Sequence, residues 1–310
     1  MGERWSEGNI PDLTDRVIMV TGANSGIGYE AARAFAQHGA HVVLACRNRA
    51  KADAAVSQIE AVALNPSVEV LEVDLGDLDS VAAAAKQFLA DHDRLDVLVN
   101  NAGLMAVPHQ TTAQGFEMQL GVNHLAPFAL TGHLLDRLLA TPGSRVVAVS
   151  SQGHRPGRIN FDDLQSEKNY RPWVAYFQSK LADLLFTYEL QRRLSAKDAS
   201  TIAVAAHPGG SRTNLGHENP GGLLNTIADL ARPLISAMMQ PASMGALPTM
   251  RAATDPTVVG GDYYGPDGLG QQRGYATKVD SSGRSKDLET ARRIWTVYEE
   301  LTGIRYAALD

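Results

Sequence analysis

The sequence predicts an α/β fold, a doubly wound parallel sheet in a single domain. Six short apolar segments, each the length of a buried strand, alternate with helical patterns along residues 16–206. A glycine-rich turn follows the first segment, and neither a composition break nor an internal repeat marks a second domain. Such regular alternation is typical of a parallel sheet covered by helices on both faces. Residues 1–310 are therefore interpreted as one nucleotide-binding domain of the Rossmann type.

Composition and charge narrow the class of protein. Hydrophobic residues make up 44% of the chain and charged residues 20%, as in ordinary globular proteins. A net charge of −6 argues against a nucleic-acid partner, and the lone cysteine, Cys46, fits a reducing compartment. The polar leader, residues 1–13, lacks a signal-peptide core, and no apolar run reaches the roughly eighteen residues of a membrane span. We therefore expect a cytoplasmic protein with no stable membrane insertion and no metal site.

Each expected strand is a short apolar run, and each expected helix has apolar residues at helical spacing. The strands are expected at 16–20, 41–46, 68–73, 96–100, 145–150 and 201–206. Helices are expected from the glycine-rich turn to 38, and then at 50–63, 80–91, 112–139, 173–194 and 286–301. Beyond the sixth strand, Pro233 interrupts an apolar stripe from Leu223 to Met239, which predicts two short helices or a kink. Glycine-rich loops are expected to resume at 263–268.

The turn Thr21-Gly-Ala-Asn-Ser-Gly-Ile-Gly28 lies between the first strand and its helix, where a dinucleotide fingerprint belongs. Glycine lets the backbone approach a pyrophosphate, which the N–H groups of the helix start then bind. The spacing differs from G-x-G-x-x-G, and no Lys-Ser/Thr pair follows as in a P-loop. A glycine-rich turn without a ligand is the alternative. The predicted cofactor-binding residues of this turn are Gly22, Asn24, Ser25, Gly26, Ile27 and Gly28.

The end of the second strand indicates which dinucleotide binds. An acidic residue usually stands there in NAD-binding sheets, but this chain has Arg47 and no carboxylate before Asp53. An arginine suits a 2′-phosphate, so NADP(H) is favoured over NAD(H), with a solvated surface arginine as the alternative. After the third strand, Asp74 either accepts from the adenine amino group or caps the next helix, and Leu75 accompanies it at the cofactor.

Tyr176 and Lys180 stand four residues apart in an expected helix, and that spacing brings both side chains to one face. A phenol titrates near pH 10, so acid–base work near neutrality requires a lowered pKa, which a nearby cation supplies. Two unrelated residues of an ordinary helix are the alternative.

The ordered motifs of residues 14–213 resemble those of the short-chain dehydrogenase/reductase family. They are Thr21-Gly-x-x-x-Gly-x-Gly28, Asn100-Asn-Ala-Gly103, Asn123, Ser150-Ser151, Tyr176-x-x-x-Lys180 and Pro208-Gly-x-x-x-Thr213. The resemblance implies that Tyr176 is the general acid/base and that Lys180 lowers its pKa and bonds the nicotinamide ribose. It further implies that Ser151 holds the substrate oxygen and Asn123 anchors a proton-relay water. Ser150 is interpreted as a structural serine.

The same resemblance assigns further cofactor contacts, to which Tyr176 and Lys180 also belong. Asn101, Ala102 and Gly103 are expected to lie beneath the adenosine ribose. Pro208 and Gly209 are expected to fix the face of the nicotinamide ring, and Ser211 and Thr213 to bond its carboxamide.

One departure indicates a subgroup. Ser151 precedes Tyr176 by 25 residues, farther than in the common family pattern. The added segment contains S-S-x-x-H and I-x-F-D-D-L, and Ser179-Lys-Leu-Ala-Asp183 follows, a combination similar to retinol dehydrogenases, WW-domain oxidoreductases and protochlorophyllide reductases. Tyr170 has no lysine four residues later and is excluded as the base. His154 either touches substrate or bonds backbone, as loop histidines commonly do.

The resemblance also places a substrate lid at 215–245. The apolar residues of this segment suit an apolar ligand; alternatively, they pack on the sheet or on another subunit.

The expected function is NADP(H)-dependent interconversion of an alcohol and a carbonyl on a small, apolar substrate. A redox-neutral epimerase or dehydratase and a non-catalytic NADP(H)-sensing protein are the alternatives, and a homo-oligomer is left open.

Overall fold

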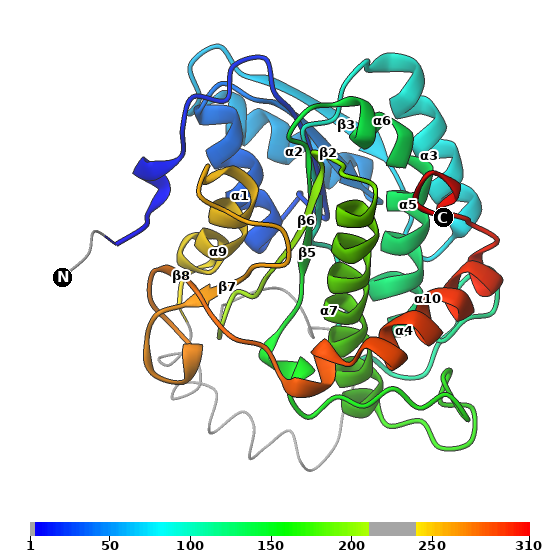
Figure 1. Ribbon diagram of the computed structural model, residues 1–310. Helices are drawn as coiled ribbons and strands as arrows, with labels where there is room; N and C mark the ends of the chain where they lie inside the picture. The colour runs from blue at the N-terminus through cyan, green and yellow to red at the C-terminus, as the bar shows by residue number, and fades with distance from the viewer. Residues whose placement is uncertain (1–3, 211–239) are drawn as a thin grey trace.

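The computed structural model describes residues 4–210 and 240–310 (Figure 1). The described residues form an eight-stranded sheet in the order β3-β2-β1-β4-β5-β6-β7-β8, parallel except for the last pair. The strands are β1 (Val17–Thr21), β2 (His41–Cys46), β3 (Ser67–Glu72), β4 (Val97–Asn100), β5 (Arg145–Val149), β6 (Ile202–Ala206), β7 (Tyr263–Pro266) and β8 (Ala276–Lys278). The predicted doubly wound α/β fold is confirmed.

Helices cover both faces of this sheet. They are α1 (Gly26–Gln37), α2 (Arg49–Glu60), α3 (Leu78–Asp91), α4 (Met118–Leu120), α5 (Ala126–His133), α6 (Leu135–Ala140), α7 (Pro172–Ala196), α9 (Ala242–Thr254) and α10 (Leu288–Thr302). A π-helical turn, η2 (Gly121–Leu125), lies between α4 and α5. Short 3-10 helices are η1 (Glu7–Asn9), η3 (Gln152–His154), η4 (Leu269–Gln271), η5 (Gly283–Lys286) and η6 (Ala307–Leu309).

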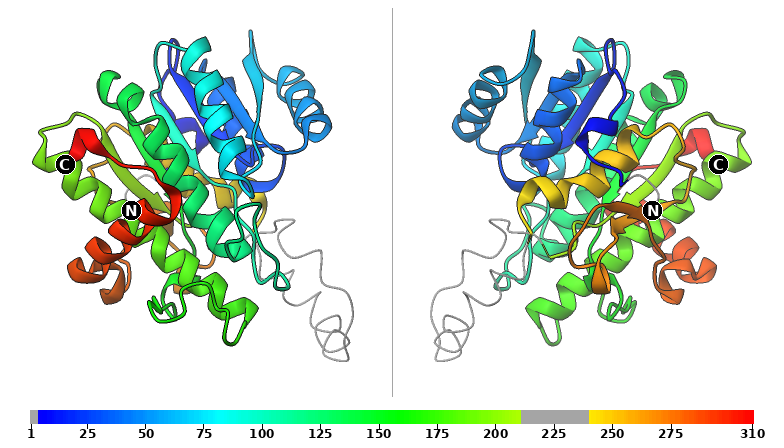
Figure 2. Two further views of the ribbon diagram at one scale, coloured as in Figure 1. Left: turned by 90° about the vertical axis from the view of Figure 1, so that its right-hand side faces the viewer. Right: turned by 90° about the vertical axis from the view of Figure 1, so that its left-hand side faces the viewer.

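Alternating residues of the strands pack into two apolar cores, one on each face of the sheet. Ile18 and Val20 point to the face covered by α1, α2 and α9, whereas Met19 points to the face covered by α3, α5, α7 and α10. Figure 1 shows α1 and α9 on one side of the strands and α5 and α7 on the other. In both views of Figure 2, α10 lies along α7, against which it packs.

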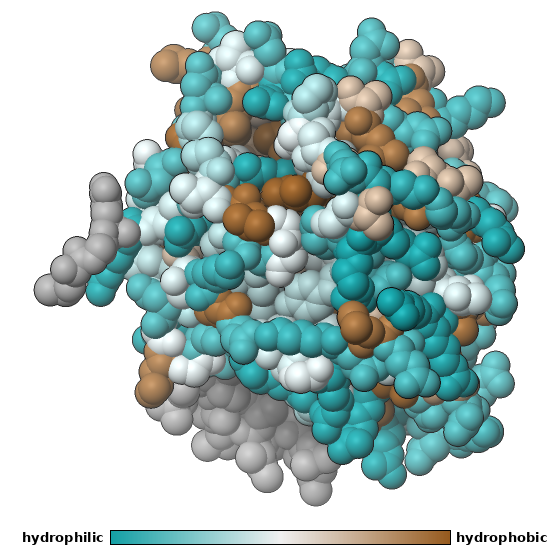
Figure 3. Space-filling model, in the orientation of Figure 1, coloured by the Kyte–Doolittle hydropathy of each residue, from teal (hydrophilic) through white to brown (hydrophobic). Residues whose placement is uncertain are grey.

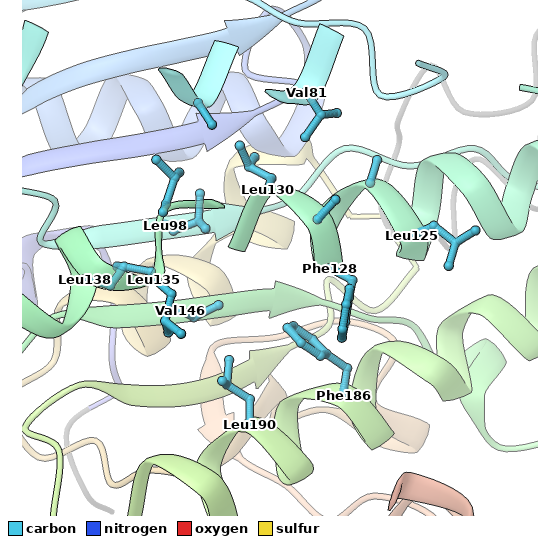
Figure 4. Close-up of a cluster of buried hydrophobic side chains, with 14 of the residues drawn as sticks. Val81, Leu98, Leu125, Phe128, Leu130, Leu135, Leu138, Val146, Phe186 and Leu190 are labelled. Carbon is cyan, nitrogen blue, oxygen red and sulfur yellow. The ribbon is translucent and has the colours of Figure 1, made fainter. Parts of the chain in front are cut away.

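The core beneath α5 and α7 contains a group of aromatic rings among its aliphatic side chains. Phe128 of α5 and Phe186 of α7 lie side by side in the same cluster as the strand residues Leu98 and Val146 (Figure 4), with ring centroids 5.6 Å apart. The face drawn in Figure 3 is mostly hydrophilic, with apolar residues in small groups. α7 is therefore fixed on the sheet by its buried side, which positions the residues at its amino-terminal end.

The expected single helix over 112–139 is wrong. Thr111 pairs with Glu117 in an isolated β-bridge, and helical structure begins only at Met118. Glu117 caps that start, because its carboxylate accepts from the N–H groups of Gln119 and Leu120. A second break occurs at Leu134, between α5 and α6.

The region after residue 240 contains more secondary structure than expected. The expected loop at 263–268 contains β7, which pairs with β6, and β8 pairs antiparallel with β7. Residues 242–245 of the expected lid are instead the first turn of α9, which packs on α1. Pro248 inside α9 obscures its helical pattern in the sequence. The rest of the expected lid through residue 239, including the stripe from Leu223 to Met239, lies outside the described residues.

Candidate active site

Strand register brings the predicted motifs to one edge of the sheet. Thr21 is level with Ala45, and Asn100 with Ala148, so the loops after β1, β4 and β5 leave the sheet side by side. In open α/β sheets, ligands bind at this carboxyl edge of the strands.

The helix α7 carries Tyr176 and Lys180 into the interior beside this edge. Pro172 occupies the first helical position, where a missing N–H costs no hydrogen bond. Tyr176 and Lys180 are only 7% and 6% exposed. Lys180 Nζ donates to the carbonyl of Val149, the last residue of β5, at 3.0 Å. The lysine is therefore fixed to the end of the strand that precedes Ser151.

Lys180 is held as an ammonium by a carboxylate on the same helix. Its Nζ donates to Asp183 Oδ2 at 2.9 Å. Burial alone would lower the pKa of Lys180, but the charge of Asp183 and the neighbouring Tyr176 raise it above its ordinary value. Lys180 is thus a cation near neutral pH.

Ser151 and Tyr176 flank the same small gap. Ser151 precedes η3, and its Oγ accepts from the N–H of Gly153 at 3.1 Å. A Cβ placed on Gly153 would lie 3.5 Å from Ser151 Oγ and 3.1 Å from Tyr176 Cε1. The hydroxyl and the phenol ring therefore both lie against Gly153, which has no side chain.

His154 anchors the serine loop. Its Nδ1 contacts the carbonyl of Ser151 at 2.6 Å, and its Nε2 accepts from the N–H of Ser282 at 3.1 Å. Burial lowers the pKa of His154, which favours the neutral ring that this bonding requires. Of the two interpretations of this residue, backbone bonding is the one observed. Ser150 is structural as well, since its hydroxyl donates to the carbonyl of Lys180 at 2.7 Å.

Asn123 fastens the loop after β4 to α7. Its Oδ1 accepts from the N–H of Leu104 at 2.6 Å, and its Nδ2 donates to the carbonyl of Leu104 and to Ser179 Oγ, both at 2.9 Å. A Cβ on Gly103 would lie 3.3 Å from Asn123 Oδ1 and 3.6 Å from Lys180 Nζ. Asn123, Gly103 and Lys180 thus lie together, and the relay water at Asn123 stays a prediction.

Thr21 and Asn101 support the glycine-rich turn. Thr21 Oγ1 accepts from the N–H groups of Asn101 and Ala102 at 2.9 and 3.0 Å, and Asn101 Nδ2 donates to the carbonyl of Thr21 at 2.8 Å. A Cβ on Gly28 would lie 2.5 Å from Asn101 Nδ2, so only glycine fits where the start of α1 passes the Asn101 side chain. The turn leads directly into the start of α1, where N–H groups without helical partners can bind a pyrophosphate.

The remaining residues of the turn differ in burial. Ser25 is exposed at the N-cap position of α1, and Gly26 begins the helix with φ +57°, as Gly22 begins the turn with φ +65°. Ile27 is buried, so its side chain packs in the core and only its backbone can face a ligand. Burial raises the pKa of the Cys46 thiol to about 11, although the backbone of Ala23 and then that of Asn24 act in the opposite direction. Cys46 therefore supports the turn.

Arg47 and Asp74 meet at the ends of β2 and β3. Arg47 Nη1 lies 3.9 Å from Asp74 Oδ1, and the arginine side chain is 75% exposed. Asp74 Oδ1 accepts from the N–H of Gly76 at 2.8 Å, whereas Asp77 is the residue that caps α3. The capping alternative for Asp74 is therefore wrong. Leu75, next to it, is buried.

The loop after β6 is ordered by buried polar side chains that the sequence did not single out. His207 Nδ1 accepts from the N–H of Gly209 at 3.2 Å, while its Nε2 lies 3.2 Å from Gln271 Oε1. Burial lowers the pKa of His207 to about 3, so the ring is neutral. The carbonyl of Pro208 accepts from Gln240 Nε2 at 2.9 Å. Ser211 and Thr213, which follow, lie outside the described residues.

Two acid–base residues near Lys180 were also missed by sequence reasoning. Asp183 Oδ1 lies 3.0 Å from Nδ1 of His124, the residue after Asn123. The π-helical turn η2 lets these adjacent residues both bond α7, Asn123 at Ser179 and His124 at Asp183. An acid three residues after the lysine was the available signal.

One group of described residues outside this site has metal-ligand chemistry. His41, Glu69 and His92 bring their potential ligand atoms within 4.8 Å of one another. His92 Nε2 lies 2.7 Å from Glu69 Oε1, and His41 Nδ1 bonds Ser67 Oγ at 2.7 Å. A separation of 2.7 Å is that of a hydrogen bond and is short for two ligands of one zinc ion. We interpret the group as a hydrogen-bonded surface cluster.

Comparison with known proteins agrees with this geometry. The short chain dehydrogenase family model matches residues 16–221. Human retinol dehydrogenase 12 is 40% identical over 294 residues, covering 95% of this chain and 88% of that protein. Human retinol dehydrogenase 13 is 39% identical over 303 residues, with coverages of 96% and 87%.

Solved structures share the fold. A crystal structure of an uncharacterized protein from Mycobacterium paratuberculosis matches with a TM-score of 0.80 and 40% identity, covering 98% of this chain and 99% of that one. A structure described as an NAD(P)-dependent gluconate 5-dehydrogenase from Beutenbergia cavernae, with bound NADP, matches at 0.61 and 26% identity, with coverages of 81% and 95%. No described helix is long and apolar enough to cross a membrane. The chain belongs to the short-chain dehydrogenase/reductase family, in the group of the retinol dehydrogenases, and is an NAD(P)-dependent oxidoreductase acting on CH–OH donors.

Proposed function

We propose that this chain is an NADP(H)-dependent oxidoreductase that interconverts an alcohol and a carbonyl on a small apolar substrate, with Tyr176 as acid and base. The observation that carries the proposal is that the Tyr176 ring and Ser151 Oγ both lie against Gly153, with the Lys180 ammonium on the same helix as Tyr176. These groups lie at the sheet edge that also carries the glycine-rich turn.

The three groups suit carbonyl reduction. NADPH, when bound, supplies the hydride to the carbonyl carbon. Tyr176 gives its phenolic proton to the carbonyl oxygen, and Ser151 donates a hydrogen bond to that oxygen as negative charge develops. Lys180 stabilises the phenolate that remains, which takes a proton back from solvent. In alcohol oxidation the same phenolate accepts the hydroxyl proton.

The preference for NADP(H) is supported by Arg47. Its guanidinium is exposed and only loosely paired with Asp74 at 3.9 Å, so it is free to bond a 2′-phosphate. The relative from Beutenbergia cavernae carries NADP. The turn residues fit such a cofactor, because Gly28 leaves no side chain between α1 and the loop of Asn101.

An apolar substrate is supported by the surface beside Tyr176. The Trp173 ring stands edge-on to the Tyr176 ring, with the two ring centroids 6.1 Å apart. The centroid of the Phe177 ring lies 5.8 Å from that of Trp173. Trp173 and Val174 are each more than half exposed, so α7 presents apolar surface next to Tyr176. The retinol dehydrogenases that the chain resembles are named for an apolar alcohol.

Turnover with a panel of apolar aldehydes and ketones, followed by NADPH absorbance, tests the proposal. Tyr176→Phe is expected to reduce kcat by about 10²- to 10⁴-fold while NADPH still binds. Tyr188→Phe, the same change farther along α7, where the hydroxyl bonds Ser281, is the control and should retain activity. Comparable turnover by Tyr176→Phe would contradict the assignment.

The alternative functions are outcomes of the same assay. A redox-neutral product without net NADPH consumption would identify an epimerase or dehydratase. NADPH binding without turnover of any carbonyl or alcohol would favour a sensing protein. The cytoplasmic location and a homo-oligomer remain predictions, which fractionation and light scattering would examine.

A further inference from the structure

The carboxylate of Asp183 lies between Lys180 and His124. Its Oδ2 accepts from Lys180 Nζ at 2.9 Å, and its Oδ1 lies 3.0 Å from His124 Nδ1. The side chains of Lys180 and Asp183 are each only 7% exposed, and that of His124 is 1% exposed. This is a buried polar chain that reaches from the Tyr176 side of α7 to η2.

A buried ammonium requires a compensating partner. The carbonyl of Val149 supplies a dipole at 3.0 Å, whereas Asp183 supplies a full opposite charge. From the position of Tyr176, the lysine and its carboxylate act together, so the carboxylate cancels part of the field that the ammonium exerts on the phenol. A lone lysine would favour the phenolate more strongly.

The surroundings leave Asp183 well placed to exert this effect. Tyr176 is on the same helix, His124 comes from η2, Tyr298 from α10 and Tyr263 from β7. Burial raises the pKa values of Tyr263 and Tyr298 well above the ordinary value, so both phenols are neutral in the working range. His124 packs against the ring of Tyr298 at 4.5 Å, which holds the imidazole toward the carboxylate.

We propose that Asp183 is a positioning residue that acts through Lys180: it fixes the ammonium at the end of β5 and limits the electrostatic support that Tyr176 receives. His124 orients the carboxylate for this task. The inference rests on the proposed roles of Tyr176 and Lys180 and adds a residue that sets the pH range in which they work.

The sign of the effect follows from the charges. Asp183→Asn keeps an oxygen that can accept from Lys180 but removes the negative charge. The Tyr176 phenolate then becomes the counter-charge that keeps Lys180 protonated, and without a competing carboxylate the ammonium stabilises that phenolate more, so Tyr176 ionises at lower pH. The acid limb of the pH profile for alcohol oxidation is expected to move down by about 0.5 to 1.5 pH units.

Two readouts test this. The first is kcat/KM for alcohol oxidation against pH in wild type and Asp183→Asn. The second needs no turnover: the near-ultraviolet tyrosinate titration of each protein minus that of its Tyr176→Phe counterpart reports the ionisation of Tyr176 alone. Asp262→Asn is the matched control, because Asp262 is also buried and paired with a lysine, Lys278, in a separate ion pair. It should leave both readouts unchanged.

A second pair of variants guards against a simple folding defect. Asp183→Ser also removes the charge and should move the limb in the same direction, whereas Asp183→Glu keeps the charge and should restore the wild-type limb. Thermal unfolding and NADPH binding verify the fold of each variant.

The outcomes are separable from those of the proposed function. A downward shift of the Tyr176 titration in Asp183→Asn supports the inference even in a protein without measurable turnover, which would refute only the proposed function. A titration midpoint that is unchanged, is raised, or moves equally in Asp262→Asn overturns the inference.

Discussion

Replacing Arg47 with alanine should remove the discrimination between NADPH and NADH. Arg47 directly follows β2, its side chain is 75% exposed, and its Nη1 lies 3.9 Å from Asp74 Oδ1. An exposed pair at that distance is worth about 0–1 kcal/mol, so little holds the guanidinium away from a phosphate. A charge-assisted bond from arginine to a 2′-phosphate contributes about 1.5–3 kcal/mol, which is roughly a 10- to 150-fold change in affinity.

Fluorescence titration of NADPH and NADH against wild type and Arg47→Ala measures this change. The variant should bind NADPH about 10- to 150-fold more weakly and NADH almost unchanged. The NADPH preference of wild type should also shrink as salt is raised, because the site is exposed. Arg49→Ala is the matched control, since Arg49 lies two residues away and pairs with Asp53 on the surface. Equal affinities for both nucleotides in wild type and Arg47→Ala would refute the reasoning.

Three further predictions concern stability. Thr21→Val removes the hydroxyl that accepts from the N–H of Ala102, so the free energy of unfolding should fall by about 1–3 kcal/mol, with weaker NADPH binding; urea unfolding and nucleotide titration check both. Phe128→Ala opens a cavity in the aromatic core and should cost about 3–5 kcal/mol in urea unfolding, and a loss below about 1 kcal/mol would contradict the packing. Burial alone would raise the pKa of Asp96. The hydrogen bonds that its carboxylate accepts, of which the one from Arg94 has the largest effect, outweigh burial and lower this pKa below its ordinary value. Its stabilisation should therefore be complete above the unfolded pKa of about 3.9 and be lost as pH falls through the folded value, so the difference in unfolding free energy between wild type and Asp96→Asn should shrink in acid.

Strands and loop motifs could be predicted from the sequence because their signals are local. The runs at β1 and β5 are apolar over their whole length, and the turn before α1 carries its glycines at fixed spacing. Pairing with an existing sheet edge is not local, which is why β7 and the three-residue β8 were missed.

The individual site residues could be predicted from the sequence, but the hydrogen bonds and the ion pair that hold them in place could not. Tyr176 and Lys180 follow from one spacing, whereas the break in the expected helix at 112–139 depends on side chains that reach other elements. Asn123 bonds Leu104 and Ser179, and such bonds between distant residues leave no periodic trace in a sequence. The pairing of Asp183 with Lys180 likewise becomes evident only when both are seen to be buried.

The most direct test of the central claim is to measure both the turnover and the NADPH affinity of Tyr176→Phe. The account predicts that the variant binds NADPH as wild type does, within a few-fold, and loses about 10²-fold or more in kcat toward an apolar carbonyl. A variant that binds NADPH normally and keeps wild-type kcat would contradict it.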